Sequence, residues 1–501
     1  MIPKFPTLAQ KKFIFPASMS MPSYEGATRG SRLANYGLSE SDGPISSVSS
    51  SEQVLRSRAR NIERNNSWGR STVTTYVTNI VGTGIKPNWQ LKDKTLKEEI
   101  QVLWKDWSKK ADTAGTLNFY GLQALACRTQ GLSGECLARF RYRRFSDPLA
   151  VPFQIELLEP DYLDMAIDKN FDNGHRLRQG IEFNKLGQKV AYYLTTEHPG
   201  DDWLFGNPAT KRIKARDLLQ IFEPLRPGQI RGVSMLAPII LRLVDLDKYE
   251  DAELIRKTIA SMITGFVTSA AQPAANASDF MNQLMQVGSD QEKLDIAFDA
   301  GTIFKLNPGD DFRLAEADDS GDNLVTWTKN QLRGVAQGAG ITYEQLTGDL
   351  EGVNYSSIRA GLLEARRRFE MLQHLILSHQ FNQPVAEKWL DIAVLSGRLK
   401  IKDYWENRHI YHRIEWQPDG WDWVDPLKDA MAKVIEVRAG FKSRAAVVSE
   451  SGADVEQLDQ QNAEDQKRQR DLDLKYDSNV NDTTKTGVFQ KAEELAYSSS
   501  E

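Results

Sequence analysis

Residues 340–370 read GITYEQLTGDLEGVNYSSIRAGLLEARRRFE, a polar stretch interrupted by glycines and followed by a strongly periodic one. Residues 340–355 predict a loop, and nothing in them resembles a nucleophile, a metal cage or a phosphate cradle. From residue 356 the apolar positions step by three and four residues, which places them on one helix face: Ile358, Leu362, Ala365, Phe369, Leu372 and Ile376. The charged run ARRRFE lies on the other side, and Asn354 or Ser356 is suited to cap the helix start.

Two further helices precede this loop and enclose an insert. The first, over about 236–265, is expected to open at Pro238 and carries one long apolar face: Leu236, Ile239, Leu243, Leu246, Tyr249, Ala252, Ile255, Ile259 and Met262. The second begins near Asp322 and runs into QGAGI. Between them, FVTSAAQPAANASD is rich in small and helix-breaking residues, and GTIFKLNPGDDFRLA is hairpin-like. The order is therefore helix, insert, helix, loop, helix.

The N-terminal half mixes helices and strands. Residues 1–50 have few apolar positions and predict a mobile arm. Two helices follow, the first ending at Asn65-Asn66 and the second at VGTGIKP, where a glycine can supply the C-terminal cap. CLARFRYRR, FQIELLEP, GIEFN and VAYYLTTEHP have the alternation or length of strands. Arg139, Arg141 and Arg143 share one strand face, which favours a solvated or inter-subunit surface over a nucleic-acid contact.

Composition excludes several classes of protein. The chain has 501 residues, a formal net charge of -5 and two cysteines, and its longest apolar runs are too short to span a membrane. The negative charge argues against bulk attraction to nucleic acid, and Cys127 and Cys136 are expected to be core thiols. We therefore expect a soluble protein of roughly two to four domains, with no membrane partner.

Motifs for catalysis or cofactor binding are lacking. The sequence has no G-x-x-x-x-G-K-[ST], G-x-S-x-G or H-E-x-x-H, and each GDD follows a proline and predicts a turn. His409 and His412 have no further ligands at useful spacing, and His374 and His379 lie on different faces of a helix. We expect no enzyme activity, no metal and no cofactor. A metal-dependent nucleic-acid enzyme using Asp310, Asp311 and the histidines remains an alternative.

Four blocks carry a resemblance to a known family: RARNIERNNSWGRSTVTTYVTNIVGTGIKP, IFEPLRPGQIRGVSMLAPII, ITYEQLTGDLEGVNYSSIRAGLLEARRRFE and WVDPLKDAMAKVIEVRAGFKSRAAVVSESGADVEQLDQQNAED. Together they resemble the lambda-like family of tailed-phage portal proteins. The resemblance implies a ring, typically of twelve subunits, at one vertex of the capsid of a virion assembled in the host cytoplasm. Double-stranded DNA would enter and leave through its axial channel. Another ring-forming head or connector protein is the second alternative.

The resemblance also implies an α+β portal fold with wing, stem, clip and crown. The expected divisions are arm 1–50, wing 51–235, stem helix 236–265, clip 266–318, stem helix 319–339, tunnel loop 340–355, wing 356–424, and crown with C-terminal tail 425–501. Its implied partners are further copies of this chain, double-stranded DNA, the terminase large subunit, head-completion or adaptor proteins, and the major capsid and scaffold proteins.

Two sets of candidate residues follow from this mapping. Residues expected to line the DNA channel are Thr342, Glu344, Gln345, Thr347, Asp349, Glu351 and Asn354. Residues expected to face the terminase on the clip are Asp279, Asp290, Glu292 and Asp295. The stretch YEQLTGDLEGVN has no lysine or arginine, which suits a passage, because each cation that neutralises a phosphate would add grip on DNA.

Overall fold

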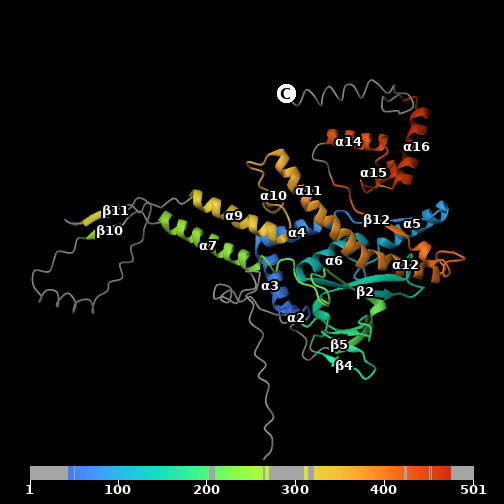
Figure 1. Ribbon diagram of the computed structural model, residues 1–501, viewed down its shortest axis with the longest axis horizontal. Coiled ribbons are helices and arrows are strands. Elements are labelled where there is room, and N and C mark those ends of the chain that lie inside the picture. The colour runs from blue at the N-terminus through green and yellow to red at the C-terminus, as the bar shows by residue number, and fades with distance from the viewer. Residues whose placement is uncertain are drawn as a thin grey trace, which may run out of the picture.

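The computed structural model describes residues 43–49, 51–165, 167–201, 209–262, 266–269, 310–313, 321–421, 426–450, 452 and 454–474. These residues form an α+β body from which one pair of helices projects, with a group of short helices on another side (Figure 1). The α+β class expected from the sequence is confirmed. The four predicted clip residues, the arm up to residue 42 and the tail after residue 474 lie outside the described residues.

The body is built on a three-stranded antiparallel sheet in the order β3-β2-β9. Its strands are β2 (Glu135–Tyr142), β3 (Phe153–Leu158) and β9 (Leu218–Phe222). The first helices of the body are α2 (Ser46–Ser49), α3 (Glu52–Asn65), α4 (Ser67–Val81), α5 (Lys94–Ser108) and α6 (Phe119–Ser133). The sequence predicted α3 and α4, whereas α2 lies at the end of the stretch that was predicted as an arm. Gly82, with φ 55°, caps α4 as the sequence predicted.

A second, five-stranded sheet lies beside the first. Its strands follow one another in the order β4-β5-β6-β7-β8, and all are antiparallel. They are β4 (Lys169–Asn170), β5 (Arg176–Arg178), β6 (Ile181–Phe183), β7 (Lys189–Thr195) and β8 (Thr210–Lys214). A turn at Leu186-Gly187 joins β6 to β7, and Gly187 has φ 81° there. On β2, Arg141 pairs with Glu156 at 2.7 Å, which fits the solvated-face interpretation of the arginines.

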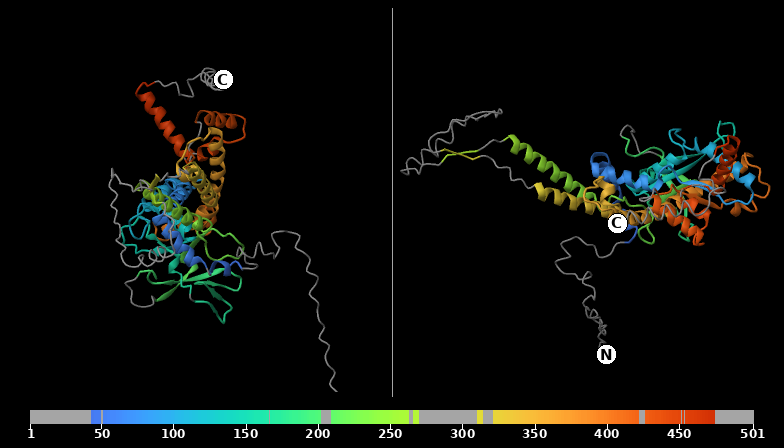
Figure 2. Two further views of the ribbon diagram at one scale, coloured as in Figure 1. Left: turned by 90° about the vertical axis from the view of Figure 1, so that its left-hand side faces the viewer. Right: turned by 90° about the horizontal axis from the view of Figure 1, so that it is seen from above.

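The projecting pair consists of α7 (Ile240–Met262) and α9 (Gly321–Ala339), which lie side by side in Figure 1 and in the right-hand view of Figure 2. Their inner ends are buried in the body, but Leu254 and Ile255 on α7 remain 66% and 58% exposed. The predicted start at Pro238 was wrong, because residues 235–239 form successive turns before the helix begins. The strand β10 (Phe266–Ser269), in the stretch predicted as breaker-rich, pairs antiparallel with β11 (Asp310–Arg313). Of the hairpin predicted within residues 301–315, only β11 belongs to the described residues.

The helix predicted after residue 356 is much longer than its apolar stripe suggested. It begins as α11 (Tyr355–Met371), continues as the π-helix η4 (Leu372–Asn382) and ends as α12 (Gln383–Leu395). Trp389 on α12 packs against Trp104 with ring centroids 5.0 Å apart. Phe119 lies at the same centroid distance from Trp104. This aromatic cluster anchors the far end of the long helix in the body.

The C-terminal helices rest on the body through ion pairs. After α13 (Arg408–Tyr411) and β12 (Ile414–Gln417), which pairs with β1 (Lys86–Trp89), come α14 (Pro426–Arg438), α15 (Arg444–Glu450) and α16 (Val455–Asp471). Lys97 on α5 contacts Asp454 and Glu456 at 3.2 and 3.0 Å. Arg359 on α11 contacts Asp429 on α14 at 3.3 Å. Among the helices that the structure describes, none combines the length and hydrophobicity needed to cross a membrane.

Candidate functional site

The segment between α9 and α11 is partly helical, which corrects the prediction of a loop throughout. Residues Tyr343–Thr347 form the helix α10. Thr342 accepts a hydrogen bond from the Gln345 amide at 3.2 Å, and the Gln345 side chain accepts one from the Thr342 amide at 3.1 Å. This reciprocal pair is a capping box, which the spacing Thr-x-x-Gln encodes directly. Gly348, with φ 70°, ends the helix in the left-handed conformation that glycine adopts without strain.

The body holds α10 by its C-terminal carbonyl groups. Ser71 on α4 donates to the Leu346 carbonyl at 2.7 Å, and Thr75 on α4 donates to the Gln345 carbonyl at 3.3 Å. The Ile341 and Leu346 side chains are buried in the core. Carbonyls at a helix end lack intrahelical donors, so the hydroxyls of α4 satisfy them and seat α10 on the body.

The following turn is organised around Asp349. The Tyr343 hydroxyl donates to Oδ2 of Asp349 at 3.0 Å, and the Glu351 amide donates to Oδ1 at 3.0 Å. Lys329 on α9 places Nζ 3.6 Å from Oδ2 of Asp349 and 3.9 Å from Oε2 of Glu351. These donors, led by the Glu351 amide, lower the pKa of Asp349 because they stabilise the carboxylate.

Arginines line the other side of the segment. The Arg333 guanidinium lies 5.7 Å from the centroid of the Tyr343 ring. A Cβ on Gly340, whose φ is 72°, would lie 1.8 Å from Nη1 of Arg368. Both arginines line a cavity of about 500 Å³ between α9, α10 and α11, together with Glu344 and Glu364. The segment therefore lies in a cationic setting that its own sequence, with no lysine or arginine, does not reveal.

The predicted channel residues fall into two groups. Thr342, Gln345, Thr347 and Asp349 form hydrogen bonds within the segment, so their side chains contribute to its local structure. The others are Glu344 at the cavity, Glu351, which is 87% exposed, and Asn354, which is exposed just before α11. Sequence reasoning missed the contacts of Lys329, Arg333, Ser71 and Thr75, because they depend on the packing of α9 and α4.

The two cysteines and His412 pack within the body. Cys127 and Cys136 are buried free thiols, as expected, and burial raises the pKa of each. His412 contacts the Tyr404 hydroxyl at 2.9 Å, whereas His409 is exposed. The side chains of Asp310 and Asp311 lie outside the described residues.

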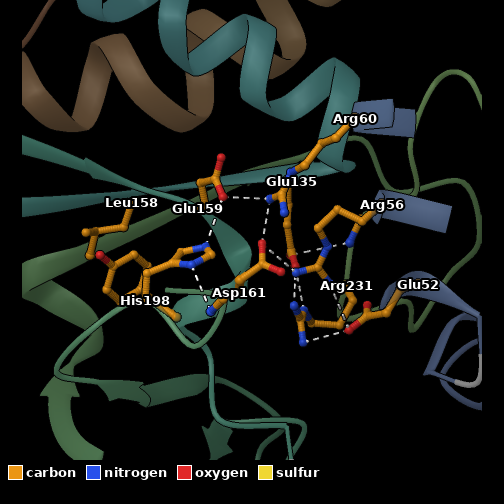
Figure 3. Close-up of polar contacts among 12 residues, drawn as sticks. Glu52, Arg56, Arg60, Glu135, Leu158, Glu159, Asp161, His198 and Arg231 are labelled. Atoms are coloured by element: carbon orange, nitrogen blue, oxygen red, sulfur yellow. Dashed lines mark hydrogen bonds and ion pairs between the residues drawn. The ribbon is translucent and has the colours of Figure 1, made fainter. Parts of the chain in front are cut away.

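A second polar cluster surrounds Glu159, Asp161 and His198, whose ligand atoms lie within 4.8 Å of one another (Figure 3). Two carboxylates and an imidazole this close together could hold a metal ion. However, Nη2 of Arg60 lies 2.9 Å from Glu159 and 2.5 Å from Asp161. Because a guanidinium already supplies the positive charge between these carboxylates, the cluster is better explained as an ion-pair network than as a metal centre.

This network continues into the core. Arg231 is fully buried and contacts Glu135 at 2.5 Å and Glu52 at 3.0 Å (Figure 3). Its loop reaches Glu135 because Gly134 and Gly232 bring two backbones together: a Cβ on Gly232 would lie 2.0 Å from the Gly134 carbonyl oxygen. Burial raises the pKa of Glu52 to about 7, against the lowering effect of Arg231.

Comparison with known proteins identifies the family. Residues 29–373 match the family described as phage portal protein, lambda family. A probable portal protein of Halomonas phage phiHAP-1 is 30% identical over 442 residues, which span 84% of this chain and 82% of that protein. Portal protein B of Escherichia phage lambda is 20% identical over 472 residues, which span 87% and 88% of the two chains. A chain in the neck of a native gene transfer agent particle, computed with C12 symmetry, is similar with a TM-score of 0.43, 16% identity and coverage of 77% and 91%.

The match over residues 29–373 and the 30% identical relative together define a phage portal protein. The chain belongs to the lambda family of phage portal proteins. The resemblance inferred from the sequence is confirmed. Family membership also favours the portal interpretation over the two alternatives, another connector protein and a nucleic-acid enzyme.

Proposed function

We propose that this chain assembles into a ring of about twelve subunits at one capsid vertex, which conducts double-stranded DNA during packaging and exit. The observation that carries the proposal is the unpartnered apolar surface of the projecting helices. Leu254 and Ile255 on α7, and Val325 on α9, are 66%, 58% and 53% exposed. Apolar side chains in such numbers on a protruding pair of helices indicate a surface completed by another protein, and in a ring it is the neighbouring subunit.

Within this ring, the segment 340–354 would line the channel, with α7 and α9 as the stem. A formal charge of -5 per chain amounts to about -60 for twelve chains, which repels DNA at long range and favours passage over retention. The terminase motor would hydrolyse ATP, and this chain would be the passage and the platform for head-tail joining. The C-terminal helices would form the crown toward the capsid interior, near the major capsid and scaffold proteins.

Ring formation is tested by placing charges on the projecting helices. The variant Ile255→Asp/Val325→Asp should remain folded but fail to form rings, because it would bury unpaired charges between subunits. Negative-stain microscopy and light scattering measure the outcome. The control Leu186→Asp changes an apolar residue that is 83% exposed at the β6–β7 turn, and it should form rings normally. A wild-type chain that stays monomeric at micromolar concentration contradicts the proposal.

The clip, residues 266–318, would contact the terminase large subunit and later the adaptor proteins. Reversing charges in pairs, as in Asp290→Lys/Glu292→Lys and Asp279→Lys/Asp295→Lys, should leave rings intact and weaken terminase docking. Terminase binding and DNA uptake by the variant rings measure this. Unchanged values for both pairs would remove these acidic residues from the docking surface.

A further inference from the structure

We propose that Lys329 and Tyr343 are positioning residues that clamp the turn 348–354 to α9 through Asp349, and so set how far this turn reaches into the channel. The contacts of the clamp are present in the folded chain, whereas its role in the channel rests on the proposed function. Neither residue was among the channel residues expected from the sequence.

The contacts place Asp349 between two donors from different elements. Tyr343 on α10 donates to Oδ2, and Lys329 on α9 lies 3.6 Å from the same oxygen. Lys329 and Arg333 are four residues apart and share one face of α9. Arg333 lies over the Tyr343 ring, so α9 holds the tyrosine from one side and the aspartate from the other.

The turn itself has few other restraints. Gly348 and Gly352 both have φ 70°, and a Cβ on either would meet nothing within 4 Å. Leu350 and Glu351 are 64% and 87% exposed. The Gly348 and Asp349 amides donate back to α10, to the Glu344 carbonyl at 2.8 Å and to the Thr347 hydroxyl at 3.1 Å. Beyond them, the Glu351 amide donates to Asp349 and the Val353 amide donates to the Leu350 carbonyl at 3.4 Å. Lys329 on α9 therefore holds the turn through Asp349 and, at the longer distance of 3.9 Å, through Glu351.

This arrangement has a functional consequence. Because the clamp starts on α9, a displacement of that helix moves the turn with it, and loss of the clamp would free the turn from the helix. In a ring, the inner edge would then be less uniform from subunit to subunit. DNA would then pass turns whose positions vary, in place of a constriction of defined width.

Hydrogen exchange on the full-length protein tests the clamp directly. In Lys329→Met/Tyr343→Phe, the Glu351 and Val353 amides, which donate hydrogen bonds within the turn, should exchange about fivefold faster, as expected for the loss of one net hydrogen bond. The phenylalanine keeps the ring beneath Arg333, and the methionine keeps the aliphatic stem of the lysine. The single variant Lys329→Arg keeps a cation beside Asp349 and should exchange as slowly as the wild type. Lys248→Met, which removes an exposed cation from α7, should leave the exchange rates of the turn unchanged.

Packaging assays on the same rings separate the clamp from the channel role. Faster exchange with slower packaging supports both the clamp and the proposed function. Faster exchange with normal packaging supports the clamp and counts against the placement of the turn in the channel. Unchanged exchange in the double variant overturns the clamp, whatever the packaging rate.

Discussion

Rings carrying Glu344→Lys and Glu351→Lys should bind double-stranded DNA in a salt-sensitive way and stall during packaging. The change adds two cations per subunit, or about 24 in a ring of twelve, to a segment that has none of its own. Each phosphate that they neutralise should steepen the dependence of log K on log salt concentration by about 0.9. Asp349 is left unchanged, because it accepts hydrogen bonds from Tyr343 and from the Glu351 amide, and its replacement would disturb the turn itself.

Two matched variants isolate the effect of charge at this place. Glu344→Gln/Glu351→Gln removes the same carboxylates without adding cations and should package nearly normally. Glu98→Lys/Glu99→Lys makes the same charge change at exposed positions on α5 and should also package normally. Filter binding at several salt concentrations and single-ring packaging rates provide the measurements. Normal packaging by the lysine variant at low salt would remove the segment from the channel.

The helices around this segment could be predicted because their signals are local. The apolar stripe of α11 and the glycine that caps α4 each depend on residues that are close together in the sequence. The helix α10 was also readable in principle, since Thr342 and Gln345 have capping-box spacing, but the glycines nearby suggested a loop. The π-helix η4 gives no comparable signal, because its apolar positions fit an α-helical stripe equally well.

The environment of the site could not be predicted, because it is made by packing. Lys329 meets Asp349 across the α9–α10 connection, and Ser71 reaches the Leu346 carbonyl from a helix 275 residues away in sequence. The sequence therefore identified an acidic segment correctly but missed the cations that face it. Similarly, β10 and β11 pair across the insert, and neither strand alternates strongly enough to be recognised alone.

The buried ion pair of Arg231 and Glu135 is another feature that no local pattern reveals, since 96 residues separate the two. Arg231→Met should destabilise the body by about 3–5 kcal/mol, because it leaves Glu135 and Glu52 buried without their shared counter-charge. Chemical denaturation followed by tryptophan fluorescence measures the loss, since the aromatic cluster around Trp104 reports on the same body. Arg141→Met, which removes the partly exposed pair with Glu156, should lose no more than about 1 kcal/mol.

Glu52→Gln distinguishes loss of a counter-charge from loss of a buried charge in the same network. The pKa of Glu52 is raised from 4.5 to about 7 in the folded protein, so between these pH values the folded state holds a proton that the unfolded state has released. Stability contributed by this group is therefore present at low pH and falls as pH rises through that window. Glu52→Gln should flatten the decline between about pH 5 and pH 8, whereas Arg231→Met should steepen it, because Glu52 then has less compensation for its charge. Equal pH profiles for wild type and both variants would contradict this prediction, which rests on the burial of Arg231, Glu135 and Glu52.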